Sequence, residues 1–180
     1  MFLILRSLLF EQVLMMQLIP MYYDKNKIIE RLIAKIKADI EKQKKSYKAA
    51  KHASIDSPGR MQSRYDTMGV ESAWVADGLA KALDEKKSYV ARLETFPFNE
   101  SSDRICLGSI VGISSNESPA LEYFFILPVA SGYELQENDL KITTLTPETP
   151  LGKILIGKEV GEEIEIHFPE IRTIIIKKLI

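Results

Sequence analysis

Cysteine and histidine are scarce in this chain, and their scarcity excludes several kinds of site. The single cysteine, Cys106, cannot form an internal disulfide, which is typical of a reducing compartment and predicts a cytoplasmic location. The two histidines, His52 and His167, lie far apart in the sequence, so neither a zinc site nor a cysteine–histidine nucleophile is expected. Cys106 stands between Ile105 and Leu107, which favours a buried structural thiol.

The chain also lacks an excess of charge of either sign. It has 24 lysines and arginines against 25 aspartates and glutamates, so its net charge indicates no class of partner. Only the distribution of charge along the chain can do so. A length of 180 residues is compatible with one large domain or two small ones.

A long uninterrupted hydrophobic run is missing as well. Residues 1–20 are apolar but are interrupted by Arg6, Glu11, Gln12 and Gln17, so no bilayer-spanning segment and no membrane partner are expected. They lack the charge pattern and cleavage site of a secretory signal. We interpret them either as an extra helix packed on the body or as a leader from an upstream translation start, with Met15, Met16 and Met21 as later starts. The second interpretation is favoured because helical patterning begins cleanly only after Pro20.

One motif suggests a nucleotide site and is rejected. Gly152 to Lys158 fits the pattern G-x-x-x-x-G-K of a phosphate-binding loop, which requires Ser or Thr next and a long helix after it. Here Glu159 follows, which would place a carboxylate against phosphate, and a turn comes next. No small-molecule substrate is therefore expected.

Two long helical patterns occupy residues 21–95. The first runs from Asp24, with Asp24 or Asn26 as its N-cap, to about His52. Its apolar seam recurs at steps of three and four residues: Ile29, Leu32, Ile36, Ile40, Gln43, Tyr47 and Ala50. The second runs from about Ser63 to Thr95, with a seam at Met68, Ser72, Val75, Leu79, Leu83, Lys86, Val90 and Leu93.

The turn residues Ser57-Pro58-Gly59 separate these patterns, which predicts an antiparallel coiled-coil hairpin. Each arm would be roughly 40 Å long, more than the rest of the chain can bury, so the hairpin should project. Trp74, the only tryptophan, lies beside the second seam, and an aromatic at helical spacing is more often part of a core than of a recognition surface. A hairpin this thin could instead leave it partly exposed, which would indicate contact with a partner.

The remainder of the chain predicts a small α+β domain. Residues 96–104 form a linker in which Pro97 stops the helix. Residues 105–180 follow with a short helix at Pro150 to Ile156 and a turn at Gly132. Five strands are expected, at Ile105 to Ile113, Tyr123 to Leu127, Lys141 to Thr144, Ile164 to Phe168 and Thr173 to Lys177. We expect them to form an antiparallel sheet.

The segment from Thr146 to Ile166 contains the most distinctive motif of the chain. A turn with two prolines leads to a short apolar stretch between Gly152 and Gly157, then to a tight turn and the alternating strand Ile164-Glu165-Ile166. This order resembles the C-terminal module of the bacterial Gre transcript-cleavage factors, which typically read SP-L-G-x-A-L-L-G-K-x-V-G-D-E-V. The resemblance extends from about Met21, a chain of typical Gre length, to the end. It implies that residues 105–180 adopt an FKBP-like fold.

The resemblance also implies a partner. Gre factors insert a similar hairpin into the secondary channel of RNA polymerase, where two tip acids help to hold a second catalytic Mg²⁺ for RNA cleavage. Their tip reads roughly D-L-S-E-N-A-E-Y, and aligning Tyr65 with its final tyrosine places Pro58 and Met61 where the acids should be. The nearest replacements are Asp56 and Asp66.

Asp56 is the candidate magnesium ligand, in a site shared with the polymerase, although it could instead cap or shape the turn. For Asp66, a place near the start of the second helix favours stabilisation of the helix dipole. The chain itself is therefore not expected to be an enzyme. Stimulation of transcript cleavage is not predicted from Pro58 and Met61.

A basic run lies on the first helix. It comprises Lys35, Lys37, Lys42, Lys44, Lys45, Lys48 and Lys51, and Arg60 and Arg64 extend it across the tip. The run is compatible with a solvated coiled-coil face or with contact to nascent RNA or DNA in the elongation complex. The candidate partner-binding residues are Arg60, Arg64, Tyr65, Lys44, Lys45, Lys48 and Lys51.

Three functions follow from these observations. The leading hypothesis is a Gre-like elongation regulator that binds RNA polymerase and inserts its hairpin into the secondary channel. The second is a prolyl isomerase of the FKBP type, against which stands the position of the only tryptophan in the hairpin rather than in the C-terminal domain. The third is an interaction module whose hairpin binds a different protein or a nucleic acid.

Overall fold

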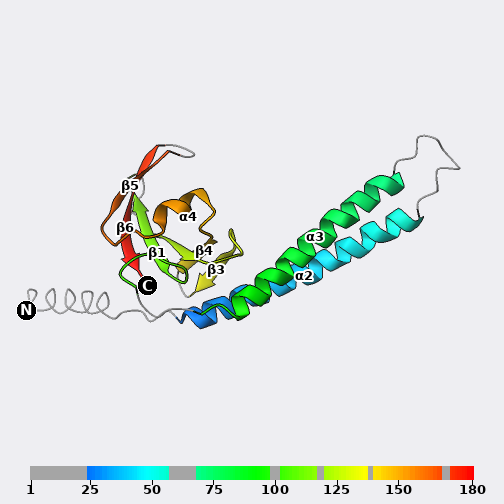
Figure 1. Cartoon of the computed structure of the whole chain (residues 1–180), viewed down its shortest axis with the longest axis horizontal. Coiled ribbons are helices and arrows are strands. Elements are labelled where there is room, and N and C mark those ends of the chain that lie inside the picture. The colour runs from blue at the N-terminus through cyan, green and yellow to red at the C-terminus, as the bar shows by residue number, and fades with distance from the viewer. Residues whose placement is uncertain (1–23, 57–67, 98–101, 117–119, 138–139, 168–170) are drawn as a thin grey trace, which may run out of the picture.

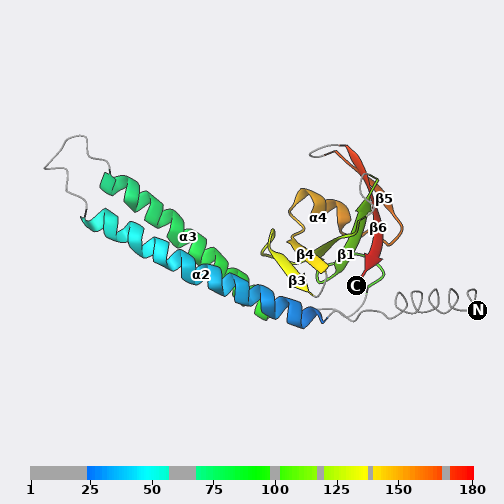
Figure 2. The same cartoon turned by 180° about the vertical axis from the view of Figure 1, so that it is seen from behind.

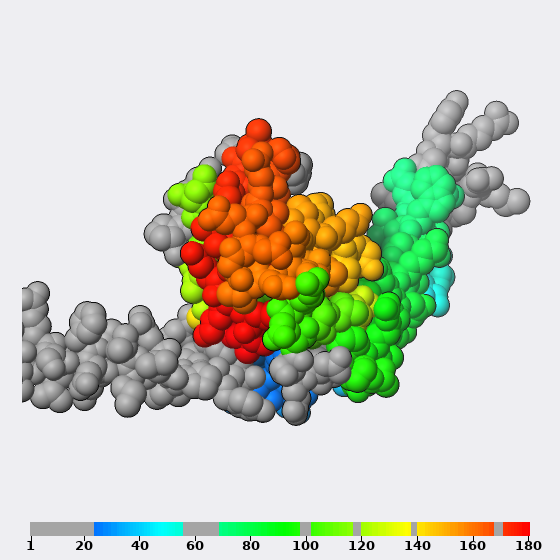
Figure 3. All heavy atoms as spheres, turned by 60° about the vertical axis from the view of Figure 1, so that its left-hand side comes forward, coloured from blue at the N-terminus to red at the C-terminus, as the bar shows by residue number. Residues whose placement is uncertain are grey.

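The hairpin predicted from the sequence is the dominant feature of the molecule. The computed structural model describes residues 24–56, 68–97, 102–116, 120–137, 140–167 and 171–180. Helices α2 (Lys25–Asp56) and α3 (Met68–Glu94) lie side by side and project from a sheet, as both views show (Figures 1 and 2). The space-filling view also shows the two helices extending past the sheet (Figure 3). The expected segment 1–20 and the expected helix start at Ser63 lie outside the described residues.

Capping fixes where α2 begins. The Asp24 carboxylate accepts hydrogen bonds from the backbone N–H groups of Asn26 (3.1 Å) and Lys27 (3.3 Å), which confirms Asp24 as the N-cap. The helix continues to Asp56, four residues beyond its predicted end, and its 32 residues span roughly 48 Å. None of the described helices is long and apolar enough to cross a membrane.

The helix–helix seam changes character along the arm. Its basal part buries seven of the predicted large apolar residues: Ile29, Leu32, Ile36, Ile40, Leu83, Val90 and Leu93. Toward the far end the prediction of Val75 is wrong, because Val75 is 56% exposed and Ala76 is buried in its place. The step from Ser72 to the next seam position is thus four residues and not three.

Six strands of the described chain form one sheet in the order β3-β4-β2-β1-β6-β5. The strands are β1 (Ile110–Ser115), β2 (Glu122–Ile126), β3 (Glu134–Glu137), β4 (Leu140–Leu145), β5 (Glu163–Ile166) and β6 (Arg172–Leu179). Four of the five pairings are antiparallel, but β2 and β4 are parallel, so the sheet is mixed and not antiparallel throughout as predicted.

Two strands differ from their predictions for local reasons. β1 begins at Ile110 and not at Ile105, because Ser109 donates its N–H to the carbonyl of Cys106 and Gly108 takes a positive φ of 90°, which together make a turn. β3 was not predicted, since its sequence Glu-Leu-Gln-Glu has only one apolar residue. It forms an edge of the sheet, where polar side chains are tolerated.

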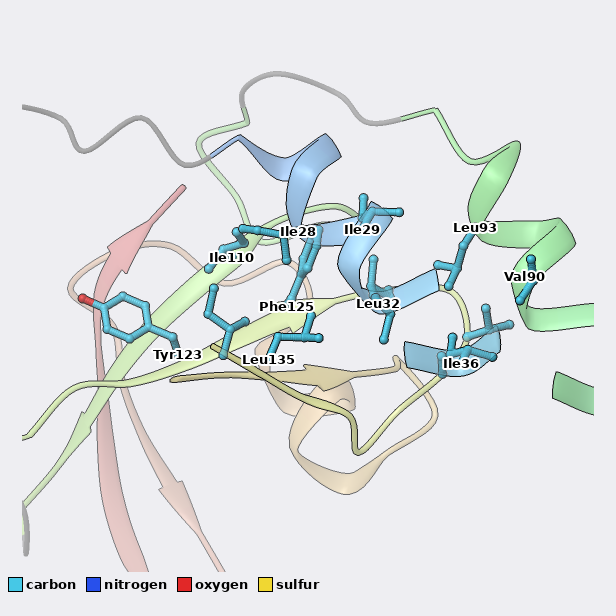
Figure 4. Close-up of a cluster of buried hydrophobic side chains, with 14 of the residues drawn as sticks. Ile28, Ile29, Leu32, Ile36, Val90, Leu93, Ile110, Tyr123, Phe125 and Leu135 are labelled. Carbon is cyan, nitrogen blue, oxygen red and sulfur yellow. The ribbon is translucent and has the colours of Figure 1, made fainter. Parts of the chain in front are cut away.

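The base of the hairpin and one face of the sheet share a single hydrophobic cluster. Ile28, Leu32 and Ile36 from α2 meet Phe125 and Leu135 from the sheet, all of them buried (Figure 4). The opposite face packs against α4 (Pro150–Leu155). Since alternate residues of β2 serve the two clusters, the sheet is covered on both sides and holds the hairpin at its base.

The motif that resembles a phosphate loop is a tightly capped turn. Thr149 caps α4 by accepting a hydrogen bond from the Gly152 N–H (3.1 Å), and α4 is only six residues long. Lys158, the lysine of the motif, forms an ion pair with Glu162 at 2.9 Å. The glycines and the lysine are thus explained by the turn itself.

Candidate functional site

The surface of the hairpin, and not a cavity, holds the candidate site. No group of three or more histidine, cysteine or acidic residues that could hold a metal occurs among the described residues. A shallow hollow of about 270 Å³ lies between the helices, lined by Asp39, Lys42, Gln43, Ser46 and Lys86. All five residues are polar or charged and the hollow is open to solvent, whereas proteins usually enclose small molecules in pockets lined mainly by hydrophobic residues.

The two helices differ strongly in charge. Helix α2 has ten basic residues against four acidic ones, whereas α3 has four basic against five acidic. The excess of positive charge on the arm is therefore carried by one helix. Such a one-sided distribution can orient the arm in the field of a charged partner.

Only the distal part of the predicted basic run is open. Lys35 donates a hydrogen bond to the carbonyl oxygen of Glu134 (2.6 Å), and Lys37 forms an ion pair with Glu94 (2.9 Å). By contrast, Lys45 and Lys48 make no ion pair within the described part of the chain.

Lys44, Lys45, Lys48 and Lys51 form the distal lysine face of α2. Two of them, Lys44 and Lys51, have local partners. Lys44 pairs with Glu41 at 2.5 Å, and this hydrogen bond lowers the pKa of Glu41, helped by the charges of Lys48 and Lys45. Lys51 lies 5.9 Å from the ring centroid of Tyr47. Neither contact neutralises the face, since Glu41 is a single acid among four lysines.

Trp74 is exposed, so of the two interpretations the core position is wrong and the exposed position is observed. Its side chain is 72% exposed, and the neighbouring Val75 and the last-turn residue Ile55 of α2 are also exposed. One turn after Trp74 comes Gly78, where an added Cβ would meet nothing within 4 Å. The periodicity places Trp74 on the helix, and the thinness of a two-helix arm is the reason for its exposure.

The tip candidates are not brought together in the described structure. Asp56 is the last residue of α2. Arg60, Arg64, Tyr65 and Asp66 lie outside the described residues, as do Pro58 and Met61. The proposed roles of these residues stay predictions.

Helix α2 also lies along the edge strand β3 through contacts that the sequence did not predict. Arg31 donates to the carbonyl oxygen of Gln136 (3.2 Å) and pairs with the carboxylate of Glu137. Lys35 donates to the carbonyl oxygen of Glu134, which lies two residues before Gln136 on the strand. These contacts, made one helical turn apart, set the direction in which the arm leaves the sheet.

Tyr133 adds a third contact one further turn along α2. Burial raises the pKa of Tyr133, and the charge of Asp39 and its hydrogen bond with Tyr133 raise it further. Asp39 lies four residues after Lys35, so Arg31, Lys35 and Asp39 form one stripe on the helix. The stripe holds the hairpin base against the sheet.

Comparison with known proteins confirms the resemblance to Gre factors. The chain is 26% identical over 144 residues to the transcription elongation factor GreA of Novosphingobium aromaticivorans, covering 78% of this chain and 82% of that protein. It is 27% identical over 88 residues to GreA of Bartonella tribocorum, covering 48% and 52%. No protein-family model matches the chain.

A solved structure is also similar, more distantly. The crystal structure of GreA factor homolog 1 (Gfh1) of Thermus thermophilus aligns with 82% of this chain and 94% of its own, at 18% identity and a TM-score of 0.35. An alignment of this quality carries no argument about function. The fold of this chain is established by its own helices and strands.

Proposed function

We propose that this protein regulates transcription elongation by binding RNA polymerase and inserting its hairpin into the polymerase secondary channel. The observation that carries the proposal is the sequence similarity to a GreA elongation factor over about four fifths of both chains. Two structural features also support the proposal: the motif between Thr146 and Ile166, which contains α4, and the projecting hairpin of α2 and α3.

The form of the arm supports insertion into a narrow opening. The arm is two helices wide, and α2 spans roughly 48 Å. Its base is attached to the sheet by Arg31, Lys35 and Asp39, so docking of the sheet at a channel rim would also aim the far end. The basic residues Lys44, Lys45, Lys48 and Lys51 would then lie within the channel, near polymerase acids or the phosphates of nascent RNA or DNA.

The tip chemistry differs from that of the cleavage factors, and this decides what the arm would do. Pro58 and Met61 replace the two tip acids. A magnesium ion at the tip would be shared with the polymerase, with Asp56 as one hard oxygen ligand. Asp56 ends α2, where the helix dipole disfavours a carboxylate, so dipole stabilisation does not explain it.

The proposal is tested first by association and then by activity. The purified chain should bind RNA polymerase core enzyme at low salt, and absence of binding would refute the proposal. A cleavage assay on a stalled elongation complex should then show little stimulation by the wild-type chain. If cleavage is stimulated, comparison of Asp56→Ala with Asp66→Ala identifies which carboxylate contributes.

A direct nucleic-acid role is the second candidate, and the open lysines Lys45 and Lys48 favour it. It differs from the first in requiring RNA binding without polymerase. Prolyl isomerisation has no comparable support, because the only tryptophan lies exposed on α3 and not in the sheet domain.

A further inference from the structure

The far end of the arm differs from its base in where its large apolar residues lie. At the base, large apolar residues fill the seam, whereas near the far end the seam positions are Ala50, Ser54, Ser72 and Ala76. Three large apolar residues of this region, Ile55, Trp74 and Val75, are 69%, 72% and 56% exposed. The seam here is thus made of small residues, and these three apolar side chains are turned outward.

Helical geometry fixes the direction of Trp74. The seam residues Ser72 and Ala76 face α2, and Trp74 is two positions from each, about 200° around the axis. Its side chain therefore points away from α2. Gly78 follows one turn later, where the space that a side chain would enter is open.

The charges near Trp74 indicate the class of its partner. Glu71 and Asp77 lie three residues before and after it, on the same side of the helix, and Lys81 pairs with Asp77 at 2.8 Å. The open lysines Lys45 and Lys48 are on the other helix. Proteins that stack aromatic side chains on bases do so beside a positively charged groove, and Glu71, Asp77 and Lys81 together give this side of α3 no excess of positive charge. This favours a protein surface over nucleic acid.

The positions of the exposed residues also indicate the shape of that surface. Ile55 is one position from the seam residue Ser54 and five from Ala50, about 100° and 140° around the axis of α2, so it points away from α3. Trp74 points away from α2, so the two side chains lie on different sides of the arm. A flat surface can cover one of them but not both. A recess that encloses the arm can cover both, and tryptophan is among the residues that most often dominate binding energy when they are enclosed.

We propose that Trp74, with Val75 beside it, is an anchor that seats in an apolar recess of an enclosing protein partner. This inference rests on the proposed function, which identifies the partner as RNA polymerase. The lysine face and the anchor are then separate contacts on opposite helices. The anchor supplies apolar contact, and the lysines supply long-range attraction.

The experiment uses the full chain, in which Trp74 is the only tryptophan. Replacing it with 5-hydroxytryptophan lets its emission be excited apart from the tryptophans of the polymerase. Quenching by acrylamide should be efficient in the free chain and strongly reduced on addition of polymerase core enzyme. In binding assays, Trp74→Ala should weaken affinity by about thirtyfold, and Trp74→Phe should recover most of it.

Two controls distinguish loss of the anchor from loss of any exposed apolar side chain and from misfolding. Ile171→Ala removes a side chain of nearly equal exposure, 70%, from the segment just before β6, outside the arm, and should cost clearly less affinity than Trp74→Ala. Circular dichroism of Trp74→Ala should match wild type, since an exposed side chain is removed from a helix. Equal losses for Trp74→Ala and Ile171→Ala would overturn the inference.

The remaining outcomes are distinct. If the polymerase binds but the indole stays fully quenchable and Trp74→Ala binds normally, the anchor is refuted while the proposed function stands. If the polymerase does not bind, both are refuted. Protection of the indole from quenching by single-stranded RNA alone would identify nucleic acid as the partner. Protection that grows with the concentration of the chain itself would identify a second copy. Either outcome would overturn the inference.

Discussion

At the position of Gly152 a side chain has no room. A Cβ added there would lie 2.0 Å from the carbonyl oxygen of Thr146, which also accepts hydrogen bonds from the backbone and hydroxyl of Thr149. The turn that precedes α4 is closed by these bonds and cannot widen without losing them. The glycine of the apparent phosphate motif is therefore explained by backbone packing.

This packing predicts opposite effects for two glycine substitutions. Gly152→Ala should lower the free energy of unfolding by about 2 kcal/mol, because the turn must shift to admit a methyl group. Gly78→Ala is the matched control, since it lies inside α3 in open space and should raise helix stability by roughly 0.5–1 kcal/mol. Urea unfolding measures both. A neutral Gly152→Ala would show that the turn is not tightly closed.

Tyr89 gives the molecule a pH dependence at the alkaline end. Its hydroxyl donates to Glu85, and this bond, with burial and the charge of Glu85, raises the pKa of Tyr89 to about 12. Unfolded tyrosine titrates near pH 10, so between roughly pH 10 and 12 the folded state binds more protons than the unfolded state. The stabilisation is complete below pH 10 and is lost as the pH rises toward 12. Unfolding measured from pH 9 to 11.5 should show a shallower decline for Tyr89→Phe than for wild type, and identical declines would contradict the assignment.

Helix α2 covers the edge strand β3, because the spacing of side chains one turn apart on the helix nearly equals the spacing of alternate residues on the strand. Arg31 and Lys35 are four residues apart on a helix, a rise of about 6 Å, and Gln136 and Glu134 are two residues apart on a strand, a span of about 6.6 Å. Each side chain can therefore reach one outward carbonyl of the strand. Edge strands invite unwanted pairing, and here the hairpin base occupies the edge.

The Arg31 contact predicts a measurable loss on its removal. Arg31→Met keeps the apolar stem but leaves the Glu137 carboxylate, whose side chain is only 10% exposed, without its guanidinium. We expect a loss of about 1–2 kcal/mol in the free energy of unfolding, moderated by the partial exposure of Arg31. Lys37→Met breaks the exposed pair with Glu94 and should change it by less than about 0.5 kcal/mol. Similar values for the two variants would show that the β3 contact is no stronger than a surface ion pair.

Local pattern predicted the elements of this chain better than their pairing. The three- and four-residue steps that mark Leu32, Ile36 and Leu83 depend only on one helix facing another, and they predicted the hairpin. The parallel pairing of β2 with β4 depends on a long connection that includes the polar strand β3. Periodicity within one strand carries no information about that path.

The candidate site was only partly predictable for a similar reason. Sequence counting put Lys35 and Lys48 in one basic run, but the fold gives Lys35 a carbonyl partner and leaves Lys48 without an ion pair among the described residues. For Trp74 the sequence left a core and an exposed position open, because helical spacing cannot tell a seam flank from an outer face. Which charges stay open is decided by the strand and the helix packed beside them.

Across the whole molecule, α2 and α3 present different charges to any partner. Two matched charge-reversal variants can show whether binding depends on the position of the basic residues or only on the net charge. Lys45→Glu with Lys48→Glu removes open positive charges of α2, and should weaken polymerase binding and flatten its dependence on salt. Lys81→Glu with Lys87→Glu makes the same change in net charge on α3, at lysines already paired with Asp77 and Asp84. If the basic face of α2 touches the partner, the first variant should lose clearly more affinity than the second in titrations at several salt concentrations. Equal losses would mean that only net charge matters and that the face makes no specific contact.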